Sequence, residues 1–135
     1  MKILAVDFGK KRVGLASGDT SNKIAFPKGV LFRVDDEQVM RELLEVCSEG
    51  GYGKVVFGMP ENLEGGDQQM KIVKNFIEIF VKISSIEVDT VDESFSSFEA
   101  DSYLKDFKGE KVRMEEGDRD AMAAKIILER YFETL

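Results

Sequence analysis

Three acidic residues lie at positions where their carboxylates could take part in catalysis or bind a metal ion. Asp7 ends an apolar run that begins at Ile3, Glu93 follows the strand expected at 86–91, and Asp120 precedes a stretch of small apolar residues. Asp is disfavoured in strands, and burying an unpaired carboxylate costs free energy. Asp7, at the end of a hydrophobic strand and beside a turn rich in Gly and Lys, therefore needs a partner. The candidates are a metal ion, a cation, or a phosphate held through a metal.

The amino-acid composition excludes several kinds of catalytic site. The chain has no histidine and a single cysteine, Cys47. Ser-His-Asp and Cys-His catalysis and zinc sites built on His or thiolates are therefore excluded. Carboxylate chemistry remains, alone or with a hard metal such as magnesium or manganese. We expect Cys47, which lies among apolar residues at helical spacing, to be a buried thiol.

Charge is distributed unevenly along the chain. The formal net charge of −7 argues weakly against nucleic-acid binding. Residues 1–33, however, hold seven Lys or Arg residues and only two acids, a local balance of +5. A basic patch on an acidic body is compatible with phosphate binding. A solvated hairpin with ordinary surface lysines is the alternative.

Length and composition predict one domain over residues 1–135, with a hydrophobic core of its own. The chain is 43% hydrophobic and 33% charged, as in globular proteins. No apolar run approaches the roughly 20 residues that a membrane span requires. The N-terminus lacks the pattern of a secretory signal, so we expect a cytoplasmic protein without a membrane partner.

The hydrophobic pattern predicts an α/β fold with a mixed five-stranded sheet and helices on both faces. The sheet combines a three-stranded antiparallel meander with two parallel strands. Ligands of such sheets gather at the carboxyl ends of central strands, where Asp7, the loop at 58–60 and Glu93 are expected. The expected strands are 2–8, 12–19, 25–34, 54–58 and 86–91, and the expected helices are 35–49, 68–83, 96–107 and 119–133.

Four segments resemble one known family. Residues 6–14 are similar to its opening Asp-x-Gly-x-Lys-x-x-Gly hairpin, and residues 57–65 to its Gly-Leu-Pro-x-Asn-x-x-Gly loop. Residues 92–100 resemble its Asp-Glu-Arg segment, and residues 120–124 its terminal Asp-x-x-Ala-Ala helix. The family is YqgF/RuvX, the Holliday-junction-resolvase-like or pre-16S rRNA nuclease proteins, and the resemblance implies a ribonuclease H-like fold.

The resemblance implies that Asp7, Glu93 and Asp120 are catalytic carboxylates and ligands of Mg²⁺ or Mn²⁺. Three gathered acids repel one another unless a divalent cation neutralises them, and such a cation also activates the attacking water. Each acid has a plainer interpretation. Asp7 could pair locally with Lys11 or Arg12, Glu93 could be an ordinary acid at a strand end, and Asp120 could simply stabilise a helix N-terminus.

Basic and polar residues near these acids are the candidates for binding substrate phosphates. Lys11 fills the Lys position of the first motif, and Arg12 follows it. Asn62, in the second motif, could contact substrate or only support its loop. One departure stands out, because Ser94 occupies the position where the family usually has Arg. We expect Phe76, Phe80 and Phe132 to pack in the core and not to stack on bases.

The function that this pattern favours is a metal-dependent nuclease that acts on structured nucleic acid. The resemblance points to maturation of the 16S rRNA 5′ end, with cleavage of branched DNA at Holliday junctions as an alternative. A non-catalytic module that binds nucleic acid or protein is a second class. A kinase-like or actin-like ATPase is a third, disfavoured because those proteins need two such domains. Monomer and homodimer both remain open.

Overall fold

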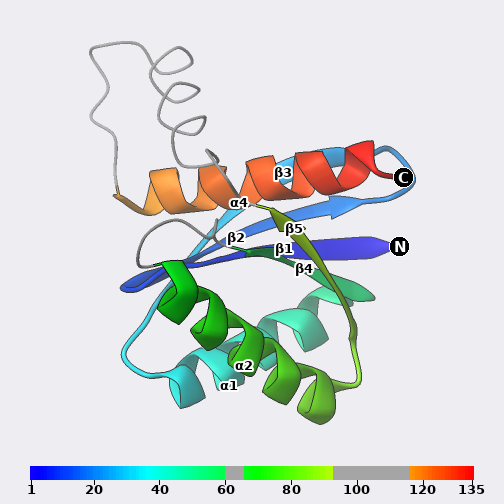
Figure 1. Cartoon of the computed structure of the whole chain (residues 1–135). Coiled ribbons are helices and arrows are strands. Elements are labelled where there is room, and N and C mark those ends of the chain that lie inside the picture. The colour runs from blue at the N-terminus through cyan, green and yellow to red at the C-terminus, as the bar shows by residue number, and fades with distance from the viewer. Residues whose placement is uncertain (60–65, 93–115) are drawn as a thin grey trace, which may run out of the picture.

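The computed structural model describes residues 1–59, 66–92 and 116–135. Figure 1 shows a sheet between two helical layers, with α1 and α2 on one face and α4 on the other. The strands lie in the order β3-β2-β1-β4-β5. They are β1 (Lys2–Phe8), β2 (Arg12–Asp19), β3 (Ile24–Phe32), β4 (Lys54–Met59) and β5 (Glu87–Asp92), and the helices are α1 (Asp36–Gly50), α2 (Gly66–Ser84) and α4 (Glu116–Glu133).

The sheet is mixed, as the sequence predicts. β1 pairs antiparallel with β2, and β2 pairs antiparallel with β3. β4 runs parallel to β1 and β5 runs parallel to β4. The carboxyl ends of these three parallel strands therefore lie at one edge of the sheet, which is the edge that carries Asp7.

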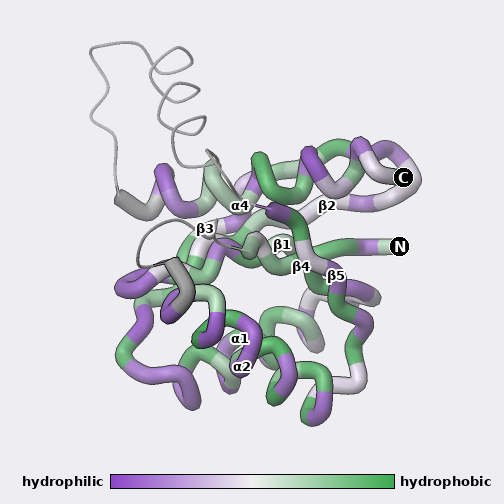
Figure 2. Tube along the Cα trace, viewed as in Figure 1, coloured by the Kyte–Doolittle hydropathy of each residue, from purple (hydrophilic) through white to green (hydrophobic). Residues whose placement is uncertain are grey.

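The strands bury alternate side chains in two separate cores, one on each face of the sheet. Leu4, Val6 and Phe8 pack with α1 and α2. Ile3 and Ala5 pack with α4. Because side chains alternate along a strand, Asp7 projects toward the α4 face. Figure 2 shows the resulting band of hydrophobic residues along the central strands between the two helical layers.

The start and the thiol of α1 agree with the sequence-based expectation. The Asp35 side chain caps the helix, accepting a hydrogen bond from the Gln38 N–H at 2.8 Å. Cys47 is buried, with 3% of its surface exposed. Burial raises the pKa of the Cys47 thiol to about 11. The thiol is therefore protonated near neutral pH and serves as a small core side chain.

Two glycines of β2 let α4 lie directly on the sheet. A Cβ at Gly14 would stand 2.0 Å from the backbone oxygen of Asp120, and one at Gly18 would stand 2.9 Å from the Phe132 ring. No side chain fits in either space. The helix contributes small residues of its own, such as Ala124, to the same contact. This close approach fixes the height of α4 above β1 and β2.

A polar cluster ties the carboxyl-terminal half of α4 to β4 and β5. The Lys54 ammonium donates to the Tyr131 hydroxyl at 2.7 Å and to the Asp89 carboxylate at 3.1 Å. The Tyr131 hydroxyl donates to the same Asp89 oxygen at 2.8 Å. The hydrogen bond from Tyr131, and then the Lys54 ammonium, hold the pKa of Asp89 below its usual value.

We expect Asp89→Asn to lower the free energy of unfolding by about 0.5 kcal/mol at pH 7, because the carboxylate is 47% exposed and its ion pair is screened. A lowered folded-state pKa stabilises the fold above the unfolded pKa of about 4, and this stabilisation is lost as pH falls. The difference from wild type in urea unfolding should therefore shrink as the pH falls below about 4. Glu87→Gln is the control, since Glu87 lies 3.6 Å from Lys54 and is 64% exposed. An equal loss in both variants would contradict a specific role for Asp89.

In the ranges that the structure describes, no helix has both the length and the hydropathy that crossing a membrane requires.

Candidate active site

The fold brings Asp7 and Asp120 to the same place although 112 intervening residues separate them in the chain. Asp7 of β1 pairs with Gly14 of β2. Gly14 lies directly beneath the backbone of Asp120 in α4. Asp7 projects to the α4 face, so both carboxylates belong to the α4 side of the sheet, near the carboxyl end of β1. Gly14 is thus the residue through which the two predicted acids become neighbours.

Arg12 contributes a positive charge to this site. Its Nε donates to the Oδ2 of Asp120 at 2.5 Å, a short charge-assisted hydrogen bond. The two side chains are 24% and 22% exposed. The bond links the first strand pair to α4 across 108 positions of sequence. A guanidinium at this point offsets part of the repulsion between the gathered carboxylates.

The turn between β1 and β2 presents two lysines to solvent. Gly9 donates its N–H to the Arg12 carbonyl at 3.1 Å. A Cβ on Gly9 would stand 2.5 Å from that same oxygen, so the tight turn requires glycine. Lys10 and Lys11 follow, and both are exposed. The turn therefore carries two cations next to the paired Arg12 and Asp120.

Arg33 holds this turn in place, a role that the sequence analysis missed. Its backbone N–H donates to the Lys11 carbonyl at 2.9 Å, and its Nη1 donates to the Gly9 carbonyl at 2.9 Å. The guanidinium also lies over the Phe8 ring, 4.5 Å from its centroid, and pairs with Asp36 at 2.9 Å. The only signal of Arg33 in the sequence is its charge within the basic segment of residues 1–33.

Two of the predicted site residues, Glu93 and Asn62, lie outside the described residues, as does Ser94. Glu93 follows Asp92, the last residue of β5, and Asp92 pairs with Met59 at the end of β4. Among the described residues, no three acidic, His or Cys side chains are grouped so as to hold a metal ion. The predicted metal site consists of Asp7, Glu93 and Asp120, and one of these three acids, Glu93, lies outside the described residues.

The predicted core aromatics are buried. Phe76, Phe80 and Phe132 are 2%, 0% and 4% exposed. Phe76 packs at 4.6 Å from Phe8 and 6.1 Å from Phe57, measured between ring centroids. The expectation that they pack in the core is confirmed, and none of the three is accessible for base stacking.

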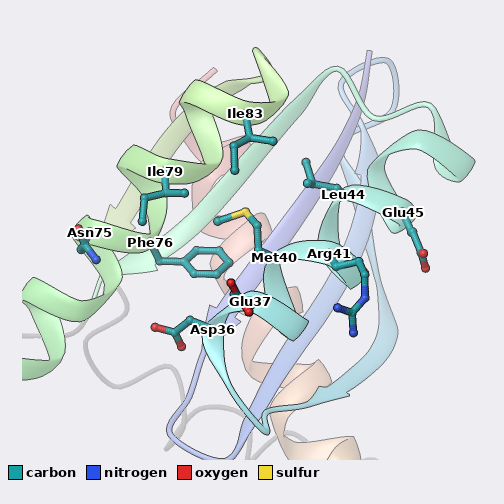
Figure 3. A pocket seen from close by; sticks show the side chains of 10 residues that line it. All are labelled: Asp36, Glu37, Met40, Arg41, Leu44, Glu45, Asn75, Phe76, Ile79 and Ile83. Atoms are coloured by element: carbon teal, nitrogen blue, oxygen red, sulfur yellow. The ribbon is translucent and has the colours of Figure 1, made fainter.

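A groove of about 820 Å³ lies between α1 and α2. Figure 3 shows Phe76, Ile79 and Ile83 of α2 facing α1, with Met40 and Leu44 among the α1 side chains that line the groove. This groove belongs to the helical layer opposite α4. It therefore lies across the sheet from Asp7 and Asp120 and is not part of the candidate active site.

Solved structures share the fold. RuvC of Thermus thermophilus, in complex with a Holliday junction substrate, matches with a TM-score of 0.63 and 13% identity over 99% of this chain and 95% of RuvC. The fowlpox virus resolvase, in complex with Holliday junction DNA, matches with a TM-score of 0.62 and 16% identity over 99% and 98% of the two chains. The chain therefore has the α/β fold of these structures, the ribonuclease H-like fold.

Sequence relatives narrow the class to a family. The family model described as "RuvX: Holliday junction resolvase" matches residues 1–134, and the chain belongs to this family. A relative from Maridesulfovibrio salexigens is 38% identical over 132 residues, 97% of each chain. One from Fusobacterium nucleatum is 34% identical over 134 residues, 98% of this chain and 96% of the relative. Both carry the name "Putative pre-16S rRNA nuclease". The expected family and nuclease class are confirmed.

Proposed function

We propose that this protein is a divalent-cation-dependent nuclease that processes the 5′ end of pre-16S rRNA in the cytoplasm. The observation that carries the proposal is the meeting of Asp7, Asp120 and Arg12 at the carboxyl end of β1, organised by the contact of Gly14 with α4. This is the edge of an α/β sheet where ligands bind. The names of two relatives that cover nearly the whole chain point to the same substrate.

The donor chemistry of the site fits a hard divalent cation. Asp7 and Asp120 offer carboxylate oxygens, the ligands that Mg²⁺ and Mn²⁺ take in proteins. In the proposed site Glu93 completes the set. A cation held there would supply Lewis acidity to the reacting phosphate and lower the pKa of the attacking water. The chain has no histidine that could bind the cation or activate the water.

The basic residues of the site act on the substrate backbone. In this proposal Lys11, exposed on a turn that Arg33 fixes, binds a phosphate next to the scissile bond. Arg12 balances the charge of Asp120 and so keeps that carboxylate close to Asp7. We assign Asn62 to the same phosphate-binding surface.

The proposal is tested by cleavage of two structured substrates by the wild-type protein. A 5′-extended fragment of pre-16S rRNA and a four-way DNA junction are incubated with Mn²⁺, with Mg²⁺, or with EDTA. We expect the RNA to be cut with either metal, faster than the junction, and neither substrate to be cut in EDTA. Faster cutting of the junction would overturn the rRNA assignment, and cutting in EDTA would overturn the cation dependence.

A second candidate function is a binding module without catalysis. The observation that favours it is the bond of Asp120 to Arg12, which gives this acid a structural partner within the protein. A folded protein that binds the RNA fragment but cuts neither substrate with either metal would establish this second function.

A further inference from the structure

Phe32 is a large aromatic side chain that the fold leaves in solvent. It is the last residue of β3, the edge strand of the sheet, and it is 69% exposed. Phe8, at the end of β1, is by contrast 2% exposed and lies under the Arg33 guanidinium. Phe32 therefore contributes little to the core, although it lies next to functional residues.

The sheet register places Phe32 beside the candidate active site. Its partner across the strand pair is Arg12. Residues directly opposite on neighbouring strands project to the same face, and Arg12 reaches Asp120 of α4. Leu31, the preceding residue, packs with the core on the other face, as alternation requires. The Phe32 ring thus lies on the α4 face next to the Arg12 side chain.

Phe32 projects from a backbone that is held on both sides. Its carbonyl accepts a hydrogen bond from the Gln38 side chain at 2.8 Å. The next residue, Arg33, donates its N–H to Lys11 at 2.9 Å. The backbone that carries the ring is therefore fixed before any ligand binds. Arg12 lies beside the ring on the same face, and Lys11 is exposed on the adjoining turn, whereas the Arg33 guanidinium lies over Phe8 on the opposite face. An exposed ring on a fixed backbone among cations is the arrangement by which proteins stack single-stranded bases.

We propose that Phe32 stacks on an unpaired base of the nucleic acid next to the scissile phosphate, so that the site selects single-stranded over duplex segments. Inside a duplex both faces of a base are covered by its neighbours, whereas an unpaired nucleotide offers a free face. Lys11 and Arg12 bind the flanking phosphates and orient the base toward the ring. The proposal rests on the proposed function for the position of the scissile bond. It adds that the substrate is single-stranded at this point, and that Phe32 is the residue that recognises the unpaired base.

The same strand provides a matched control residue. Phe26 is 57% exposed, six positions before Phe32 in β3. Its partner in the register is Ser17, next to Ala16, which packs on the α4 side. Phe26 therefore projects to the opposite face, away from Arg12 and Asp120. Phe26 and Phe32 are alike in residue type and exposure but differ in the face to which they project.

Tryptophan fluorescence gives a direct readout, because the chain has no tryptophan of its own. Phe32→Trp and Phe26→Trp are each titrated in EDTA with a ten-nucleotide single-stranded RNA, and with a blunt RNA duplex of the same length. We expect the single strand to quench the emission of Phe32→Trp and to leave that of Phe26→Trp unchanged. The duplex should quench neither.

Affinity provides an independent measurement with the same control. In fluorescence anisotropy with the labelled single strand, Phe32→Ala should raise the Kd roughly tenfold, in line with the loss of one base stack. Phe26→Ala should leave the Kd unchanged. Equal quenching by single strand and duplex, or an unaltered Kd in Phe32→Ala, would overturn the stacking role.

The outcomes separate this inference from the proposed function. Binding is measured in EDTA, so the stacking result does not depend on cleavage. If the wild type cuts the RNA fragment but Phe32→Ala binds and cuts normally, only the stacking role is wrong. If no nucleic acid binds the wild type, both proposals are wrong.

Discussion

Asp7→Asn is expected to lower the rate of Mn²⁺-dependent cleavage of the pre-16S rRNA fragment by about 10³, a loss of roughly 4 kcal/mol in transition-state stabilisation. The amide keeps the shape of the side chain but loses the negative charge through which a carboxylate holds a divalent cation. Asp7 lies at the end of β1, where the sheet ends and the Gly9 turn begins. The exchange therefore leaves the buried strand residues in place, and the fold should survive it.

The matched control for this variant is Asp19→Asn. Asp19 ends β2, pairs in the sheet with Lys2, and therefore lies at the opposite end of β1 from Asp7. Both variants lose one negative charge from a strand end, but only one lies beside Asp120. Rates are compared below the melting temperature of each variant, with circular dichroism as the check on folding. A folded Asp7→Asn protein that cuts as fast as Asp19→Asn would show that Asp7 is not a ligand of the catalytic cation.

Metal binding separates a catalytic from a purely structural role for Asp7. In a calorimetric titration, Mn²⁺ should bind the wild type and bind Asp7→Asn at least tenfold more weakly. Unchanged Mn²⁺ affinity together with lost cleavage would mean that Asp7 acts on the substrate and not through a cation.

The elements of this fold could be predicted because each leaves a local pattern. The apolar run at Ile3 to Val6 and the start of the helix expected at 35–49 depend on a few neighbouring residues, and both elements appear in the structure as expected. Helical spacing was less reliable at the edges of the apolar face. Helical spacing with Phe76, Ile77 and Phe80 places Ile72 and Val81 on the apolar side of α2, but they are 39% and 41% exposed. Helical spacing identifies the apolar face of a helix. How much of that face is buried depends on how closely the neighbouring helix, here α1, packs against α2.

The assembly of the candidate site was less accessible from the sequence. The chain suggested that Asp120 lies on a helix able to approach the sheet, since small residues follow it. It could not indicate that Arg12 pairs with Asp120, because that contact joins residues 108 positions apart through the packing of α4 on β2. The position of Phe32 beside Arg12 depends on the register of two strands. A shift of one residue would turn its ring to the other face.

Gly14→Ala is expected to be the most destabilising small substitution near the site. The new methyl group would lie 2.0 Å from the carbonyl oxygen of Asp120 and 2.5 Å from its carbonyl carbon. Both are backbone atoms, which cannot rotate away as a flexible side chain can. Either α4 must lift from β2 or the strand must move. Overpacking of this kind costs about 3 kcal/mol, and we expect that loss in urea unfolding and a melting temperature lower by several degrees.

The effect of Gly14→Ala should extend beyond stability, because the same contact sets the position of Asp120 relative to Asp7. At a temperature where the variant is fully folded, cleavage should still fall at least tenfold, since small displacements of catalytic groups are costly. Gly53→Ala is the control, because its new Cβ would meet only the flexible side chain of Met1, at 3.1 Å. That exchange should change stability and cleavage little. If Gly14→Ala lost stability but kept full cleavage, the site would tolerate movement of α4, and the close contact would serve packing alone.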